Sequence, residues 1–191
     1  MKDEVDGSAP FHSSFILPHS SLRLMRAIQI DTLTYRPIDL EFDAELAVQN
    51  HYRACVASFG DDRRYEGRDA YLRYLREQVE IYPDGSVLAF DARGECVGQL
   101  ELRVPYGLAT GYIGLYYVTP PFRGRGYGRR VNAYAERYFR SWEATRVELH
   151  VSPTNRRAVG FYHRLGYDFT GEEPPGAALR RMAKALDVTV P

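Results

Sequence analysis

One segment of the chain, residues 112–167, restricts the fold more than any other. An almost continuously apolar stretch, YIGLYYV, leads into a short loop with three glycines, and an amphipathic helical pattern begins directly after the loop. Glycine lets a ligand approach the backbone without meeting a Cβ atom, and the first N–H groups of a helix have no partner inside it. The glycines are Gly124, Gly126 and Gly128, and the arginines around them are Arg123, Arg125, Arg129 and Arg130. This arrangement predicts a strand, a loop and a helix that together bind a phosphate or pyrophosphate.

The overall composition is that of a globular protein. Hydrophobic residues make up 45% of the 191 residues, and 25 basic and 25 acidic residues give a formal net charge of zero. A neutral chain creates no general field that attracts nucleic acid or an anionic membrane surface. No apolar run of the sequence approaches the ~20 residues that a membrane-spanning helix needs. We therefore expect a cytoplasmic protein that has neither nucleic acid nor a membrane as its partner.

The two cysteines carry no sign of a metal centre or a disulfide. Cys55 falls in a predicted helix and Cys96 in a predicted strand, and the sequence has no CxxC pattern. Such spacing favours small core residues over metal ligands. We expect no metal site.

The first 24 residues differ in composition from the rest of the chain. They open with acidic residues and include two prolines, whereas a secretory signal needs a basic start and an uninterrupted apolar stretch. We expect residues 1–24 to be a poorly structured N-terminal extension. Residues 25–191 have the length of a single domain.

Periodicity and turn residues place the elements of that domain. The predicted strands are 28–36, 86–91, 95–104, 112–118, 146–151, 167–170 and 179–186. The predicted helices run from an Asp43 cap to about Phe59, from an Asp69 cap through Val79, from Gly128 to about Ser141, and from a Thr154 or Asn155 cap to Gly166. This order predicts an α/β (α+β) fold, in which a mixed, mostly antiparallel sheet of about seven strands is flanked by about four helices on its two faces.

Two motifs in this order resemble those of the GCN5-related N-acetyltransferase (GNAT) family. The loop RGRGYG at residues 123–128 is similar to the family's acetyl-CoA loop, [QR]-x-x-G-x-[GA], and NRRAVGFYHRLGY at residues 155–167 is similar to its second signature. The element order agrees as well, so the resemblance covers residues 28–186. It implies the GNAT fold and an N-acyltransferase that moves acetyl from acetyl-CoA to a primary amine of a small molecule or peptide. The amine would attack directly, with both substrates bound.

The resemblance also implies how acetyl-CoA would be bound. Backbone N–H groups of residues 125–129 would cradle its pyrophosphate, and the strand end at residues 117–119 would pair with its pantetheine arm. A bulge would splay this strand from VELHV and open a cleft for the thioester. Tyr162 would lie near the sulfur and protonate the departing thiolate. The implied binding residues are Tyr117, Val118, Thr119, Arg123, Gly124, Arg125, Gly126, Tyr127, Gly128, Arg129, Asn155 and Tyr162.

The sequence does not identify a single residue that accepts the proton of the amine. Tyr112 stands where many members of the family carry a glutamate, and a phenol with a pKa near 10 is a poor base at neutral pH. His150, twelve residues before Tyr162, stands where a carboxylate is proposed in enzymes that acetylate protein N-termini. An imidazole suits that role, and Glu148 on the same side of the strand would set its tautomer. Glu101 is the rival base. The sequence gives little support for a carboxylate base. An acceptor amine of low pKa, which depends less on a base, is therefore favoured.

Other interpretations of the same residues remain. The basic loop could be a solvated patch that binds nucleic acid, but it lies between an apolar strand and an amphipathic helix. A dinucleotide site would need GxGxxG, whereas the loop has GxGxG. Tyr162 shares the apolar face of its helix and could be a core residue. An idle acyl-CoA sensor or an interaction module with this fold stays an alternative to an enzyme, and the sequence leaves a homodimer open.

Overall fold

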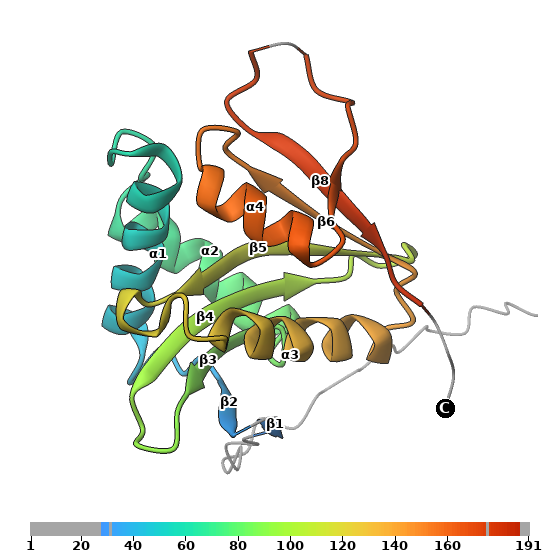
Figure 1. The fold of residues 1–191 in the computed structure, drawn as a ribbon. Coiled ribbons are helices and arrows are strands. Elements are labelled where there is room, and N and C mark those ends of the chain that lie inside the picture. The colour runs from blue at the N-terminus through green and yellow to red at the C-terminus, as the bar shows by residue number, and fades with distance from the viewer. Residues whose placement is uncertain (1–27, 31, 175, 188–191) are drawn as a thin grey trace, which may run out of the picture.

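The computed structural model describes residues 28–187 except 31 and 175, and this part of the chain forms one eight-stranded sheet with helices on both faces (Figure 1). The strand order is β1-β2-β3-β4-β5-β6-β8-β7, and only β5 and β6 run parallel. The strands are β1 (Ile28–Ile30), β2 (Leu33–Pro37), β3 (Ser86–Phe90), β4 (Cys96–Arg103), β5 (Thr110–Val118), β6 (Arg146–Val151), β7 (Asp168–Phe169) and β8 (Arg180–Ala185). The helices are α1 (Ala44–Phe59), α2 (Arg68–Ile81), the short 3₁₀ turn η1 (Pro120–Phe122), α3 (Tyr127–Ser141) and α4 (Arg156–Arg164).

The predicted mixed, mostly antiparallel sheet is confirmed, with one strand more than expected. The single strand predicted for residues 28–36 is a hairpin of β1 and β2, because Thr32 has a positive φ of 69° and reverses the chain. The hairpin of β3 and β4 forms as predicted. The expected extension, residues 1–24, lies outside the described residues.

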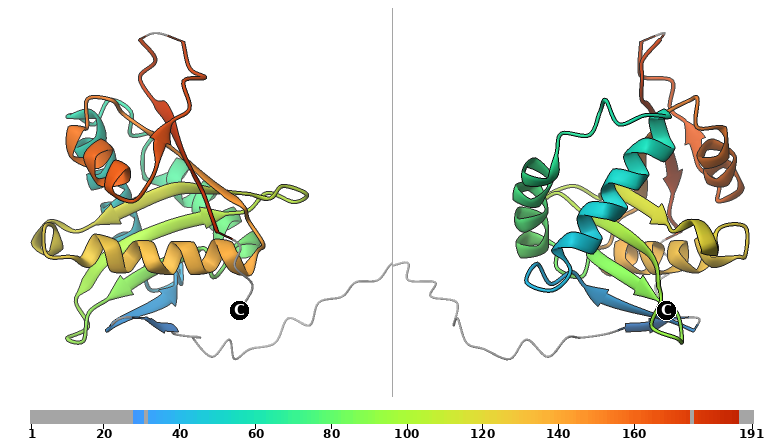
Figure 2. Two further views of the ribbon diagram at one scale, coloured as in Figure 1. Left: turned by 45° about the vertical axis from the view of Figure 1, so that its right-hand side comes forward. Right: turned by 90° about the vertical axis from the view of Figure 1, so that its left-hand side faces the viewer.

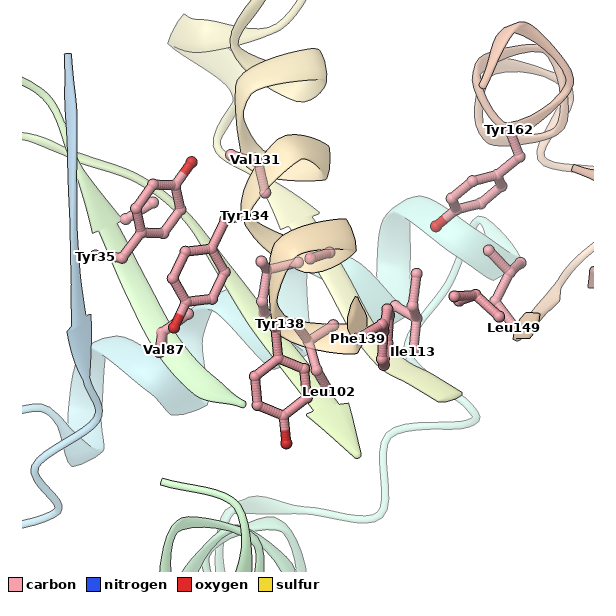
Figure 3. Close-up of a cluster of buried hydrophobic side chains, with 14 of the residues drawn as sticks. Tyr35, Val87, Leu102, Ile113, Val131, Tyr134, Tyr138, Phe139, Leu149 and Tyr162 are labelled. Carbon is pink, nitrogen blue, oxygen red and sulfur yellow. The ribbon is translucent and has the colours of Figure 1, made fainter. Parts of the chain in front are cut away.

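Two layers of helix cover the sheet. In the right-hand view of Figure 2, α1 and α2 lie on one side of the strands and α3 and α4 on the other. The larger core cluster lies beneath α3 and α4, where Tyr35 and Tyr134 stack with their ring centroids 4.2 Å apart (Figure 3). A smaller cluster beneath α1 and α2 includes Val48 and Leu75. Helices therefore pack against both faces of the sheet.

The starts of α1 and α2 correct two expected caps. Asp43 precedes α1, but its carboxylate accepts hydrogen bonds from Arg36 and from the N–H of Asp39, not from the first turn of the helix. Gly67 precedes α2, and Asp69 lies inside the first turn. There its negative charge interacts favourably with the helix dipole, but its side chain does not cap the helix.

Two general properties of the described chain bear on function. No helix in it is both long enough and apolar enough to cross a membrane. No group of three or more histidine, cysteine, aspartate and glutamate side chains in the same residues is arranged to hold a metal ion.

Candidate active site

The two parallel strands at the centre of the sheet separate halfway along. β5 and β6 pair from Thr110 opposite Arg146 to Ile113 opposite Leu149, and the pairing ends there. On its other edge, β5 shifts register against β4, so that Gly114 has no partner between Ile113 and Leu115. A bulge bends the strand that carries it. The bulge and splay expected for this strand are thus both present.

A cavity of about 870 Å³ lies where the strands separate. It is bounded by the second half of β5, the end of β6, the last two turns of α1, the glycine loop and α4. The predicted site residues that line it are Tyr117, Val118, Arg123, Gly124, Gly126, Gly128, Arg129, His150, Asn155 and Tyr162. The predicted site residues outside its lining are Glu101, Thr119, Arg125 and Tyr127.

The glycine loop lines this cavity and contains backbone N–H groups that have no acceptor among the described residues. Gly124 and Gly126 have φ of 74° and 84°, in the left-handed region where a side chain is strained. Among the described residues, no acceptor faces the N–H groups of residues 124–128. The N–H of Arg129 bonds to the carbonyl of Gly126 at 3.1 Å. The N–H groups without an acceptor are therefore those of residues 124–128, and the N–H of Arg129, which the predicted cradle of 125–129 includes, is occupied within the helix.

Gly128 has a different reason for being glycine. A Cβ atom there would lie 2.9 Å from the ring of Phe161, so its absence lets α3 and α4 approach closely. The hydroxyl of Tyr116 donates to the carbonyl of Gly128 and ties β5 to the same turn. The start of α3 is thereby fixed against both the strand and α4.

The free edge of β5 offers hydrogen-bonding groups to the cavity. The N–H of Thr119 bonds to the carbonyl of Val97 at 2.9 Å, and its hydroxyl also donates to carbonyls of β4. Alternate residues of an antiparallel strand face the same neighbour, so Tyr116 and Val118 direct their backbone groups toward the splay. Arg123 already donates to the Val118 carbonyl at 2.7 Å. Within the predicted 117–119 stretch, the backbone groups of Tyr117 and Thr119 thus face β4, and only those of Val118 face away from it.

Asn155 has a structural task in addition to its place in the lining. Its side-chain oxygen accepts from the N–H of Ala158 at 3.1 Å and caps α4. Of the two predicted caps, Asn155 is correct and Thr154 is not. The cap fixes the helix that carries Tyr162.

Tyr162 belongs to the core and to the cavity at once. Its side chain leaves α4 toward the sheet, on the side of Leu149 (Figure 3), and only 9% of the residue is exposed. Its ring meets those of Tyr116 and Tyr167 edge-on, with centroids 6.1 Å and 5.7 Å away. Its hydroxyl has no hydrogen-bond partner within the described chain. Burial raises the pKa of Tyr162, so the hydroxyl keeps its proton at neutral pH.

His150 and Tyr112 form a hydrogen-bonded pair at the cavity. Alternation along β6 buries Val147 and Leu149 and leaves the His150 side chain on the other side, 31% exposed. The Tyr112 hydroxyl lies 2.7 Å from Nδ1 of His150. Burial raises the pKa of Tyr112, so the phenol keeps its proton at neutral pH, and the tautomer of the imidazole decides which of the two groups donates. The imidazole thus reaches the cleft, and the phenol is its partner.

The expected role of Glu148 beside His150 is wrong. Its carboxylate accepts from Nε of Arg146 at 2.8 Å and lies 3.5 Å from Arg181. Two arginines thus hold this carboxylate away from the imidazole. Strand alternation correctly placed Glu148 and His150 on one side, but it could not tell which cation lies beside them.

Glu101 lies on the face of the sheet that α2 covers and does not line the cavity. It is buried under α2, where the Tyr71 hydroxyl donates to Oε1 at 2.6 Å and the Gln99 amide donates at 3.1 Å. Burial raises its pKa, despite these hydrogen bonds. A carboxylate enclosed in this way is poorly placed to take a proton from a substrate.

Replacement of Glu101 by glutamine is expected to leave kcat within about threefold of the wild type, because the cavity lining is unchanged. The folded protein holds the Glu101 proton to higher pH than the unfolded chain, whose glutamates titrate near about 4.3. The free energy of unfolding therefore falls as pH rises above that value, and E101Q should remove this part of the dependence. Steady-state kinetics and urea unfolding at several pH values check both. A loss of about 100-fold in kcat would restore Glu101 as the base.

Comparison with known proteins places this geometry in a family. The sequence matches the acetyltransferase (GNAT) family over residues 48–167. A curated relative, the N-alpha-acetyltransferase MAK3 of Arabidopsis thaliana, is 31% identical over 120 residues. The aligned part makes up 61% of this chain and 61% of that relative, so less than two thirds of its length is matched.

Solved structures share the fold at low sequence identity. Spermidine N-acetyltransferase from Vibrio cholerae, in complex with CoA and spermine, has a TM-score of 0.63 at 21% identity, over 81% of this chain and 95% of that chain. Ard1 from Thermoplasma volcanium has a TM-score of 0.62 at 21% identity, over 81% and 98%. The PaiA N-acetyltransferase from Thermoplasma acidophilum, in complex with coenzyme A, has a TM-score of 0.62 at 16% identity, over 81% and 99%.

Proposed function

Because the chain belongs to the acetyltransferase (GNAT) family, we propose that it is an acetyl-CoA-dependent N-acetyltransferase that acts on the α-amino group of a peptide. One observation carries the proposal. A single cavity joins the bare N–H groups of the glycine loop, the Tyr162 hydroxyl and the Tyr112–His150 pair. An anion site, a proton donor and a proton acceptor around one splayed strand are what acyl transfer from a CoA thioester requires.

Acetyl-CoA fits the groups that the cavity offers. The N–H groups of residues 124–128 and the start of α3 would hold the pyrophosphate. The backbone groups of Tyr116 and the N–H of Val118 would pair with the pantetheine amides as an added strand does, while the Val118 carbonyl accepts from Arg123. The thioester would then lie in the gap where β5 and β6 separate, beside the Tyr162 hydroxyl.

The reaction needs two proton movements, and the cavity supplies a residue for each. As the amine nitrogen bonds to the acetyl carbon, its proton passes to the Tyr112–His150 pair, in which Nδ1 accepts the phenol proton. As the carbon–sulfur bond breaks, Tyr162 gives its proton to the sulfur. Positioning of the two substrates supplies the rest of the rate.

The charges of the lining favour a peptide over a polyamine. Among the described residues, the lining includes four arginines, Arg123, Arg129, Arg157 and Arg164, and no carboxylate. The lining therefore offers no carboxylate to bind the second ammonium group of a polyamine. An α-amine with pKa near 8 loses only about 1.4 kcal/mol to protonation at pH 7, whereas a lysine-like amine loses about 4.6 kcal/mol, so an imidazole suffices as the base. The similarity to an N-alpha-acetyltransferase supports the same choice.

A second cavity gives the acceptor room to extend. Its volume is about 620 Å³, and it shares Phe59 and Ser152 with the first cavity. Residues from the segment between α1 and α2 and from the segment before β8 form its walls. A chain that enters with its amine at His150 could continue along it.

Three acceptors test the proposal at equal concentration with acetyl-CoA in excess. They are a short peptide with a free α-amine, the same peptide with its α-amine blocked and a lysine present, and spermidine. We expect kcat/KM for the free peptide to exceed the other two by at least about tenfold at pH 7, from the protonation difference alone. A preference for spermidine would overturn the assigned acceptor class and leave acetyl transfer intact.

Two expectations about the protein in the cell remain predictions. A cytoplasmic location agrees with the two cysteines, Cys55 and Cys96, both of which are free thiols. The second expectation concerns the oligomeric state, for which the sequence allows a homodimer. Cell fractionation tests the location, and light scattering after gel filtration tests the oligomeric state.

A further inference from the structure

A carboxylate that the sequence did not single out faces the second nitrogen of His150. Oε1 of Glu173, in the segment between β7 and β8, lies 3.9 Å from Nε2 of the ring, while Nδ1 is bonded to Tyr112. The Glu173 side chain is only 14% exposed. Both of its oxygens are buried, and neither has a hydrogen-bond partner within the described residues. A buried carboxylate without hydrogen bonds is costly, so its position calls for a reason.

The other groups around His150 do not take the place of Glu173. Arg181 lies opposite His150 on β8, and its Nε is 3.7 Å from Glu173. The same arginine makes its shorter contact, 2.8 Å, with Glu172, whose side chain is 55% exposed. Tyr112 is already bonded to Nδ1, and Glu148 is held by arginines. Glu173 is the carboxylate that the structure brings to Nε2.

A carboxylate at Nε2 decides which nitrogen of a neutral imidazole carries the proton. With the proton on Nε2, facing Glu173, Nδ1 keeps a lone pair and accepts the Tyr112 hydroxyl. With the proton on Nδ1, the ring would donate to the phenol oxygen and could not take its proton. The contact of 3.9 Å is longer than a hydrogen bond, as catalytic contacts often are without substrate.

We propose that Glu173 is a positioning residue that holds His150 in the Nε2–H tautomer, so that Tyr112 can pass the proton of the acceptor amine to Nδ1. The inference rests on the proposed function for its consequence in catalysis. It makes Glu173, His150 and Tyr112 one chain of contacts from the segment before β8 to the cavity. The Nε2 proton stays on the ring throughout, and the ring becomes a cation beside a carboxylate when Nδ1 accepts.

Glu172 provides a matched control for Glu173. Both carboxylates come from the same segment and contact Arg181, but only Glu173 contacts His150. E173Q is expected to lower kcat about tenfold or more, with the KM for acetyl-CoA within about twofold. E172Q should stay within about twofold, and E173D should recover part of the loss. Equal losses in E172Q and E173Q would overturn the proposal, because they would point to Arg181 and the segment it holds.

A double-mutant cycle separates positioning from general damage. In the H150Q background there is no tautomer to set, so E173Q should change kcat by less than about twofold. If E173Q costs the same factor with and without His150, the glutamate does not act through the imidazole and the proposal fails.

The tautomer itself can be read without any turnover. With ¹⁵N-labelled histidine at a pH where the ring is neutral, the His150 signals, identified by their loss in H150Q, should show Nε2 protonated and Nδ1 bare. In E173Q they should shift toward a mixture of the two tautomers. Unchanged signals in E173Q would overturn the role of Glu173. Absence of acetyl transfer to every amine, with the signals behaving as expected, would instead overturn the proposed function.

Discussion

Replacement of Tyr162 by phenylalanine is expected to lower kcat about 100-fold or more and to leave the affinity for acetyl-CoA within about threefold. Phenylalanine keeps the edge-on ring contacts with Tyr116 and Tyr167, so packing on α4 is preserved. The hydroxyl has no partner to lose in the described chain, and its proton is retained because burial raises the pKa of Tyr162. The variant therefore removes only the proton that Tyr162 is proposed to give to the departing thiolate. Steady-state kinetics and calorimetric titration measure the two effects separately.

Tyr167 is the control for this substitution. It is a neighbouring buried tyrosine, 1% exposed, whose ring touches that of Tyr162 but does not line the cavity. Y167F should change the free energy of unfolding as little as Y162F does, and it should keep its turnover. If Y162F works at the wild-type rate, Tyr162 is a core residue without a catalytic role, and water protonates the thiolate.

Replacement of Gly126 by valine is expected to weaken acetyl-CoA binding at least about tenfold. The residue precedes α3 with φ of 84°, where a β-branched side chain is strongly strained. A Cβ atom there meets nothing within 4 Å, so the loss comes from the backbone, which must leave the shape that gathers the N–H groups of residues 124–128. At acetyl-CoA about 100-fold above the wild-type Kd, the stabilisation should fall from about 2.7 to about 1.4 kcal/mol. Thermal unfolding with and without acetyl-CoA reads this difference.

Gly107 separates cofactor binding from backbone strain. It lies between β4 and β5 with φ of 75° and open space around it, away from the cavity lining. G107V should carry a similar strain and keep full stabilisation by acetyl-CoA. If G126V binds acetyl-CoA as tightly as the wild type, the glycine loop is not the pyrophosphate site.

Local patterns in the sequence were sufficient for the parts of the site that lie close together along the chain. The glycine loop is encoded by adjacent residues, and so is the cap that Asn155 gives to α4, because the acceptor and donor are three residues apart. The strand β6 was predicted to the residue, since alternation shows directly in VELHV.

Contacts between distant segments could not be read in the same way. Tyr112 and His150 meet because β5 and β6 run parallel and then diverge. The register of these two strands cannot be predicted from a local sequence pattern. Glu173 reaches the imidazole only through the course of the segment before β8. Glu101 alternates as a surface residue would, and only the packing of α2 over that face of the sheet buries it. Charges beside a strand are therefore the least predictable part of such a site.

Acetyl transfer itself is the most direct test of the proposed function. The protein is mixed with acetyl-CoA and a peptide that has a free α-amine, and free CoA thiol and acetylated peptide are measured in the same sample by absorbance and mass spectrometry. We expect both products to appear in equal amounts, to depend on the peptide, and to fall together in Y162F. Binding of acetyl-CoA without CoA release in the presence of peptide, lysine or spermidine amines would contradict the proposal and indicate a sensor with this fold.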